Sequence, residues 1–204
     1  MSQDRLRQHV VGELGKALSK HVVTATVVSE REETAWHEAG HATMYRVLVG
    51  TQLSHVDCYP SPIGAGRTAR HGFTRGYCDP NNKAAYSVCF LAGYIAQVLG
   101  CGSTALAVSG SRSDLDAVLA ACGAQKTTQL PSAIEQQAQQ VLSYVAEGAV
   151  ALAVHLRPAI EAIRGELLLV PRLYGGRVTA LVQSSMSGQP WPQDHLQILR
   201  VGAW

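Results

Sequence analysis

The sequence feature that most constrains this chain is the pattern H-E-x-x-H formed by His37, Glu38 and His41. It lies in segment 34–49, where apolar residues recur at helical spacing. Residues four apart share one face of an α-helix, so two imidazoles can hold one metal ion from a single rigid element. Glu38 follows about 100° around the helix, where a carboxylate can accept a proton from a metal-bound water. The pattern predicts a metal centre; the alternative is a surface helix with two unrelated histidines.

The start and the end of this helix are also marked. Ser29 and Glu32 have the spacing of a capping box, and Glu32 and Glu33 place negative charge at the positive end of the helix dipole. Gly50 is a typical residue to follow a helix end. We therefore expect a helix that starts after Ser29 and stops at Gly50.

The composition indicates a globular and rather apolar protein. The 204 residues are 47% hydrophobic and 16% charged, a length that normally forms one domain. The net charge is +2 with both signs scattered, so we expect no nucleic-acid partner. The longest apolar stretch, near 145–156, is too short to span a bilayer, so we expect no membrane insertion.

The cysteines and the first residues bear on the cellular compartment. The five cysteines are odd in number and form no C-x-x-C pair, which predicts neither a disulfide framework nor a cysteine-rich zinc site. Unpaired thiols fit a reducing compartment, and the first residues do not resemble a signal peptide. We therefore expect a cytoplasmic protein.

The remaining pattern predicts a mainly α-helical fold with a small β-hairpin or sheet over the H-E-x-x-H helix. Extended segments are expected over 53–59 and 67–77, joined by a turn rich in proline and glycine. The free edge of such a hairpin can pair with an extended peptide, or the hairpin can simply cover the helix; the residues leave both open. Further helices are expected over 3–19, from Asp79-Pro80 to Gly102, from Asp114 to Ala124, from Pro131 to Arg164 with breaks at Gly148 and Pro158, and over 178–184.

A catalytic metal site needs a third protein ligand besides the two histidines. The metzincin continuation requires glycine at position 44 and histidine at position 47, where this chain has Met44 and Val47. No glutamate lies between Glu38 and Glu135, so a nearby downstream glutamate is also excluded. The nearby carboxylates that remain are Asp57, Asp79, Asp114 and Asp116.

These four aspartates all have ordinary structural interpretations. Asp57 lies in a predicted strand, and Asp79 is expected to cap a helix. Asp114 and Asp116 open a helix after a polar loop, which can bring either one to the metal, but aspartate is favourable there without any ligand. The residues alone therefore leave the third ligand open. Asp116 is also a candidate acceptor for a ligand histidine, and His71 a candidate to stabilise an oxyanion.

Two metal motifs resemble those of the FtsH-type zinc metallopeptidases, the peptidase half of ATP-dependent membrane AAA proteases. W-H-E-A-G-H-A is close to that family's Y-H-E-A-G-H-A, and G-S-R-S-D-L-D-A-V resembles its G-A-S-N-D-L-x-x-A. In the family the aspartate of the second motif is the third zinc ligand, and it corresponds to Asp114. Looser matches are F-L-A-G-Y-I-A-Q-V-L-G and L-L-L-V-P-R-L-Y-G-G-R-V-T-A-L-V, so the resemblance runs from about Glu30 to Val182.

The resemblance implies a helical, zincin-like peptidase domain over residues 29–186. His37, His41 and Asp114 would hold Zn²⁺, and Glu38 would be the general base. The family assembles as hexamers, which implies self-association. Residues 1–28 would be an appendage for packing or self-association, and 187–204 a tail rich in proline and glycine.

The chain also departs from the family. FtsH proteins carry transmembrane helices and an ATPase, but this sequence contains no G-x-x-x-x-G-K-[ST] loop. Gln97 and Val98 stand where acidic residues are usual. We therefore expect a zinc endopeptidase that cleaves flexible or unfolded segments without its own ATPase, or with a separate unfoldase. The alternatives are a regulatory protease dedicated to one partner protein and a metal-binding module without catalysis, which would have no need of Glu38.

Overall fold

A computed structural model describes residues 3–21, 28–48, 51–59, 72–79, 81–102, 112–122 and 132–190, with backbone alone for 3 and 132–135. Within these ranges the protein is mainly α-helical with a small three-stranded antiparallel sheet, which confirms the predicted fold class. The elements are α1 (Gln3–Leu18), α2 (Glu30–Val47), β1 (Thr51–Cys58), β2 (Gly72–Cys78), α3 (Lys83–Cys101), α5 (Arg112–Ala121), α6 (Ser132–His155), α7 (Arg157–Leu167), β3 (Arg172–Tyr174) and α8 (Gly175–Ser185).

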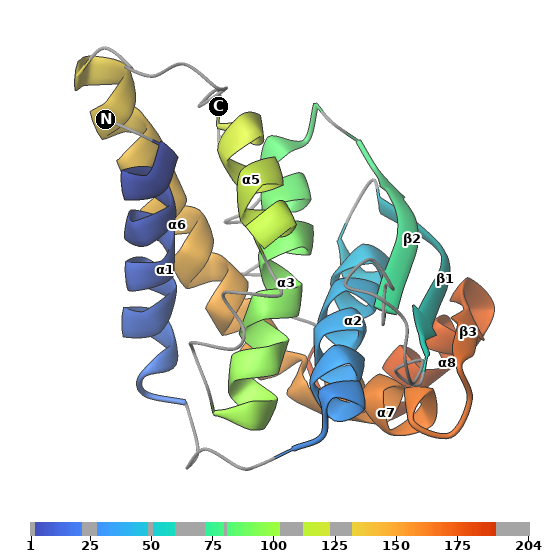
Figure 1. Cartoon of the computed structure of the whole chain (residues 1–204). Coiled ribbons are helices and arrows are strands. Elements are labelled where there is room, and N and C mark those ends of the chain that lie inside the picture. Colours follow the sequence, from blue (N-terminus) through green and yellow to red (C-terminus); the bar gives the residue numbers. More distant parts are fainter. Residues whose placement is uncertain are drawn as a thin grey trace.

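Helix α2, which carries the H-E-x-x-H pattern, lies in the middle of the fold (Figure 1). On one side it packs against α3, and on the other it packs against β1 and β2. Helices α1, α5 and α6 pack around α3, while α7 and α8 lie against α2. Because it has neighbours on most sides, nearly all of α2 from Ala35 to Val47 is buried.

The predicted start of α2 is confirmed. Ser29 is the N-cap, and its Oγ accepts a hydrogen bond from the backbone N–H of Glu32 at 3.2 Å. The carboxylate of Glu32 binds Arg164 of α7, so it ties two helices together. The helix stops at Val47, earlier than predicted; Gly50 lies outside the described residues.

Small residues allow α2 and α3 to approach each other closely. A Cβ atom added to Gly40 would lie 2.3 Å from the backbone oxygen of Ala92, and one added to Gly100 would lie 2.2 Å from the ring of Trp36. Such distances are too short for a real Cβ, so the two helices touch through glycine at both positions. This contact therefore sets the distance between α2 and α3, and so which α3 atoms the α2 side chains reach.

Helix α3 is a core helix, since most of its residues are buried. Among the described helices it is the one that is long and apolar enough to cross a membrane by length and composition, but 83% of that stretch is buried inside the protein. Its start differs from the prediction. Asn82 is the N-cap and accepts from the N–H of Ala85 at 3.1 Å, whereas Asp79 accepts from the N–H of Asn81 in the preceding turn. Asn82 is the N-cap because it directly precedes Lys83, the first helical residue. Pro80 lies outside the described residues.

Helix α1 confirms the helix predicted over 3–19; it is amphipathic and packs against α6. The side chains of its apolar face belong to the same core cluster as those of α2 and α3: Leu6, Val10, Leu14 and Leu18 are each exposed by 1% or less. Its apolar stripe therefore joins the common core.

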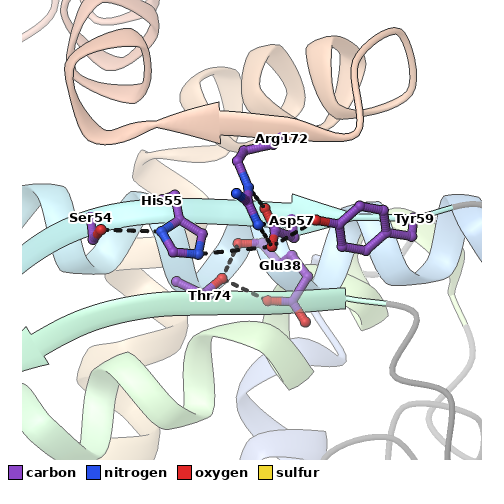
Figure 2. A network of polar contacts seen from close by, with 7 residues as sticks. All are labelled: Glu38, Ser54, His55, Asp57, Tyr59, Thr74 and Arg172. Atoms are coloured by element: carbon purple, nitrogen blue, oxygen red, sulfur yellow. Dashed lines mark hydrogen bonds and ion pairs between the residues drawn. The ribbon is translucent and has the colours of Figure 1, made fainter.

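The sheet has the strand order β2-β1-β3, and both pairings are antiparallel. The predicted hairpin is present as β1 and β2, but its connection, residues 60–71, lies outside the described residues. Strand β3 was not predicted, because three residues are too few to show an alternating pattern. The guanidinium of Arg172 on β3 binds both carboxylate oxygens of Asp57 on β1, at 2.6 and 2.7 Å (Figure 2).

The long C-terminal helical region is broken at one of the two predicted places. Helix α6 continues through Gly148, so that predicted break is wrong. Its neighbours Val145 and Ala149 are buried, and tertiary packing outweighs the low helix propensity of one glycine. The break comes at Leu156, and Pro158 lies in the first turn of α7, where proline is tolerated.

We expect Gly40→Ala to lower the free energy of unfolding by about 1–3 kcal/mol, because its Cβ would overlap the Ala92 backbone. Gly12→Ala on α1 is the matched control, because no atom lies within 4 Å of its Cβ and alanine is the better helix former. Chemical denaturation measures both. Equal effects of the two substitutions would contradict the close α2–α3 contact.

Candidate metal centre

Helices α2 and α5 bring three potential metal ligands together. The ligand atoms of His37, His41 and Asp114 all lie within 4.8 Å of one another. The two histidine Nε2 atoms are 3.0 Å apart, and Oδ2 of Asp114 lies 3.3 Å from His37 Nε2 and 3.4 Å from His41 Nε2. This group could hold a metal ion. Among the described residues, no other three histidine, cysteine, aspartate or glutamate side chains bring their ligand atoms this close together.

The structure separates Asp114 from the other three candidate carboxylates. Asp57 is paired with the arginine of β3, and Asp79 accepts a backbone hydrogen bond in a turn. Asp116 binds Arg7 of α1, with the Nε–Oδ1 distance at 2.6 Å. Residues two apart point to opposite sides of a helix, so Asp116 faces away from the histidines when Asp114 faces them.

The backbone of α3 orients one of the histidines. The Nδ1–H of His41 donates to the carbonyl oxygen of Cys89 at 2.7 Å. A proton held on Nδ1 leaves the Nε2 lone pair for a metal, and such hydrogen bonds commonly orient histidine ligands. The acceptor for His41 is therefore a backbone carbonyl, and the suggestion that Asp116 fills this role for His41 was wrong.

Gly93 of α3 leaves the space that a metal ion would need. A Cβ at this position would lie 2.4 Å from His41 Nε2 and 2.8 Å from His37 Nε2. An imidazole nitrogen binds a metal at roughly 2 Å, so any larger side chain here would occupy the region in which an ion would bind. Two imidazole nitrogens and a carboxylate oxygen also form a common ligand set for a transition metal. The residues thus fit a metal, and Gly93 is part of the site.

The charges of the cluster stabilise one another. Burial alone would lower the pKa of His41, but the hydrogen bond and the charge of Asp114 outweigh it and, with the charge of Glu38, raise that pKa to about 9. Burial would raise the pKa of the Asp114 carboxyl, but its hydrogen bonds to His37 and His41 hold it well below its usual range. Without a metal, the site is thus an aspartate beside a protonated histidine.

Glu38 lies beside the cluster but is not one of its three members. Its side chain is buried, and its Oε2 accepts a hydrogen bond from Thr74 Oγ1 of β2 at 2.6 Å (Figure 2). Its charge contributes to the raised pKa of His41. This arrangement is compatible with a proton acceptor next to a metal. His71, the predicted oxyanion group, lies outside the described residues.

Two residues near this site escaped the sequence reasoning. Gly93 had a visible signal, a glycine inside an otherwise apolar helical pattern, which often marks a close approach. Thr74 had none, because a threonine in a strand is ordinary.

Comparison with protein-family models and with curated proteins finds no match to this chain.

We predict that Gly93→Ala abolishes metal binding and keeps the fold. The new methyl group would fill the space between the two Nε2 atoms, while alanine favours the helix. Isothermal titration with Zn²⁺ measures the binding, and circular dichroism the fold. Gly165→Ala on α7 is the control, because its Cβ meets no atom within 4 Å. Normal metal binding by Gly93→Ala would place the ion elsewhere.

The raised pKa of His41, about 9, predicts that protons compete with the metal at neutral pH. Below that pH the metal must displace a proton from Nε2, so the apparent dissociation constant should increase about tenfold for each unit by which the pH falls from 9 to 7. Competition with a chromophoric chelator at pH 7, 8 and 9 measures this slope. Constant affinity across the range would show that His41 binds no exchangeable proton there.

Proposed function

We propose that this chain is a zinc-dependent endopeptidase of the FtsH type, which cleaves flexible or unfolded protein segments without an ATPase of its own. The observation that carries the proposal is the position of Glu38 beside the cluster of His37, His41 and Asp114. Three protein ligands are typical of catalytic zinc sites, which keep a fourth position for water, whereas structural sites use four. A buried carboxylate next to such a site is the usual general base.

Each residue has a separate task in this reaction. Zinc bound here would polarise the scissile carbonyl and lower the pKa of a bound water to about 7. Glu38 accepts the proton of the attacking water and then delivers it to the leaving amine. Cys89 holds His41 through its backbone carbonyl, and Asp114 supplies the negative charge that offsets a dication.

The sheet supports the choice of an extended substrate. Among the strands that the structure describes, β2 lies at the edge of the order β2-β1-β3, and its Gly72 and Thr74 contact Glu38. An extended peptide can add to the edge of a sheet through main-chain hydrogen bonds, and only flexible or unfolded segments can adopt that conformation. A substrate strand beside β2 would therefore run close to the general base.

Cleavage of unstructured casein by the wild type and by Glu38→Gln, with zinc content measured on the same samples, tests this proposal. We expect about one zinc per chain in both proteins. We expect kcat/KM to fall by at least about 100-fold in Glu38→Gln, because the general base is lost. Zinc binding without cleavage of casein or of any partner protein would favour a metal-binding module. Zinc bound by neither protein would contradict the site itself.

A further inference from the structure

We propose that strand β2 positions the general base, through a seat for the Glu38 carboxylate formed by Gly72 and Thr74. This inference rests on the proposed function and names two residues that would act through Glu38, neither of which touches the substrate's reacting atoms. Both belong to β2, and both face α2, since residues two apart lie on the same side of a strand. We call these two residues the carboxylate seat.

Thr74 contacts one carboxylate oxygen directly. Its Oγ1–H donates to Glu38 Oε2 at 2.6 Å, and the same Oγ1 lies 3.3 Å from the backbone oxygen of Glu38 (Figure 2). A hydrogen bond to a charged group is stronger than one between neutral groups, and this one is partly buried. It fixes Oε2 and so leaves Oε1 to take the proton from the water.

Gly72 shapes the seat around the other oxygen. A Cβ at Gly72 would lie 2.6 Å from Glu38 Cγ and 2.7 Å from Oε1. It would also lie 2.5 Å from Cγ2 of Thr34, one turn earlier on α2. The bare backbone at position 72 therefore lets the carboxylate pack directly on the strand, and any side chain there would displace it.

The seat matters because a glutamate side chain is flexible. Its side-chain torsions rotate freely in the absence of contacts, so a glutamate held only by its backbone samples several positions. General base catalysis needs hydrogen-bond reach to the water, roughly 2.6–3.2 Å. A carboxylate that β2 already holds meets this need before the substrate arrives.

The placement on β2 also couples substrate binding to catalysis. The proposed substrate pairs with the edge of the same strand that holds Glu38. Pairing would place the substrate directly beside the strand that already holds the carboxylate. The alternative is that Thr74 only satisfies a buried charge. That alternative predicts a loss of stability, with no selective loss of kcat.

Three threonine variants separate these interpretations. Thr74→Val removes the hydroxyl and keeps the shape, Thr74→Ser keeps the hydroxyl, and Thr34→Val is the matched control. Thr34 borders the same seat, but its hydroxyl donates to the backbone of its own helix, at Glu30 O. Measurements are kcat and KM on casein, the dissociation constant for Zn²⁺, and the ¹³C shift of the Glu38 carboxyl. That signal is assigned by its loss in Glu38→Gln.

We expect Thr74→Val to lower kcat about 10- to 100-fold, with KM and zinc affinity within about threefold of wild type. Thr74→Ser should restore kcat to within about threefold. The carboxyl shift should move in Thr74→Val, in the metal-free protein as well, and stay unchanged in Thr34→Val. Gly72→Ala should lower kcat in the same way, and it serves as the second variant if Thr74→Val does not fold.

Active wild type with an equally active Thr74→Val would overturn the inference and leave the proposed function intact. An equal fall of kcat in Thr34→Val and Thr74→Val would also overturn it, since the effect would then be one of packing. Zinc-bound wild type that cleaves nothing would instead contradict the proposed function, and the positioning role with it.

Discussion

The contact between α2 and α3 is the constraint on which the candidate site depends. Gly40 and Gly100 remove the side chains that would hold the helices apart. The approach they allow brings the backbone of Cys89 within hydrogen-bond distance of His41, and it brings Gly93 against both imidazoles. The close approach of α2 and α3 therefore also orients His41 and leaves room for an ion. The same pair of helices thus forms the close core contact and most of the candidate metal site.

Electrostatics explains why the half-buried carboxylate of Asp114 is favourable near this contact. A carboxylate in a protein interior is unfavourable unless a positive charge accompanies it. In the metal-free protein, a proton on His41 supplies that charge, because its pKa is raised to about 9. A divalent ion would replace the proton and satisfy Asp114 more completely. Either the proton or a divalent ion would therefore offset the charge of Asp114.

The sequence contained the elements of the site but not their assembly. The helix around His37 and His41 was predictable, because a capping serine and a helical period mark it independently of its neighbours. The choice of Asp114 over Asp57 or Asp116 could not be made from the residues alone, since each aspartate is favourable where it stands. The choice depends on tertiary contacts with the arginines of α1 and β3. Strand β3 and the contact of Thr74 with Glu38 could not be predicted for the same reason, because both depend on contacts between segments far apart in the sequence.

X-ray absorption spectroscopy at the zinc edge of the zinc-loaded protein tests the central claim most directly. The account predicts a first shell of nitrogen and oxygen at roughly 2.0–2.2 Å, with outer-shell scattering from two imidazoles. The five cysteines are free, so they are the competing ligands for a soft metal. A sulfur shell at roughly 2.3 Å would contradict the account, because it would place the zinc on cysteines and away from the H-E-x-x-H helix.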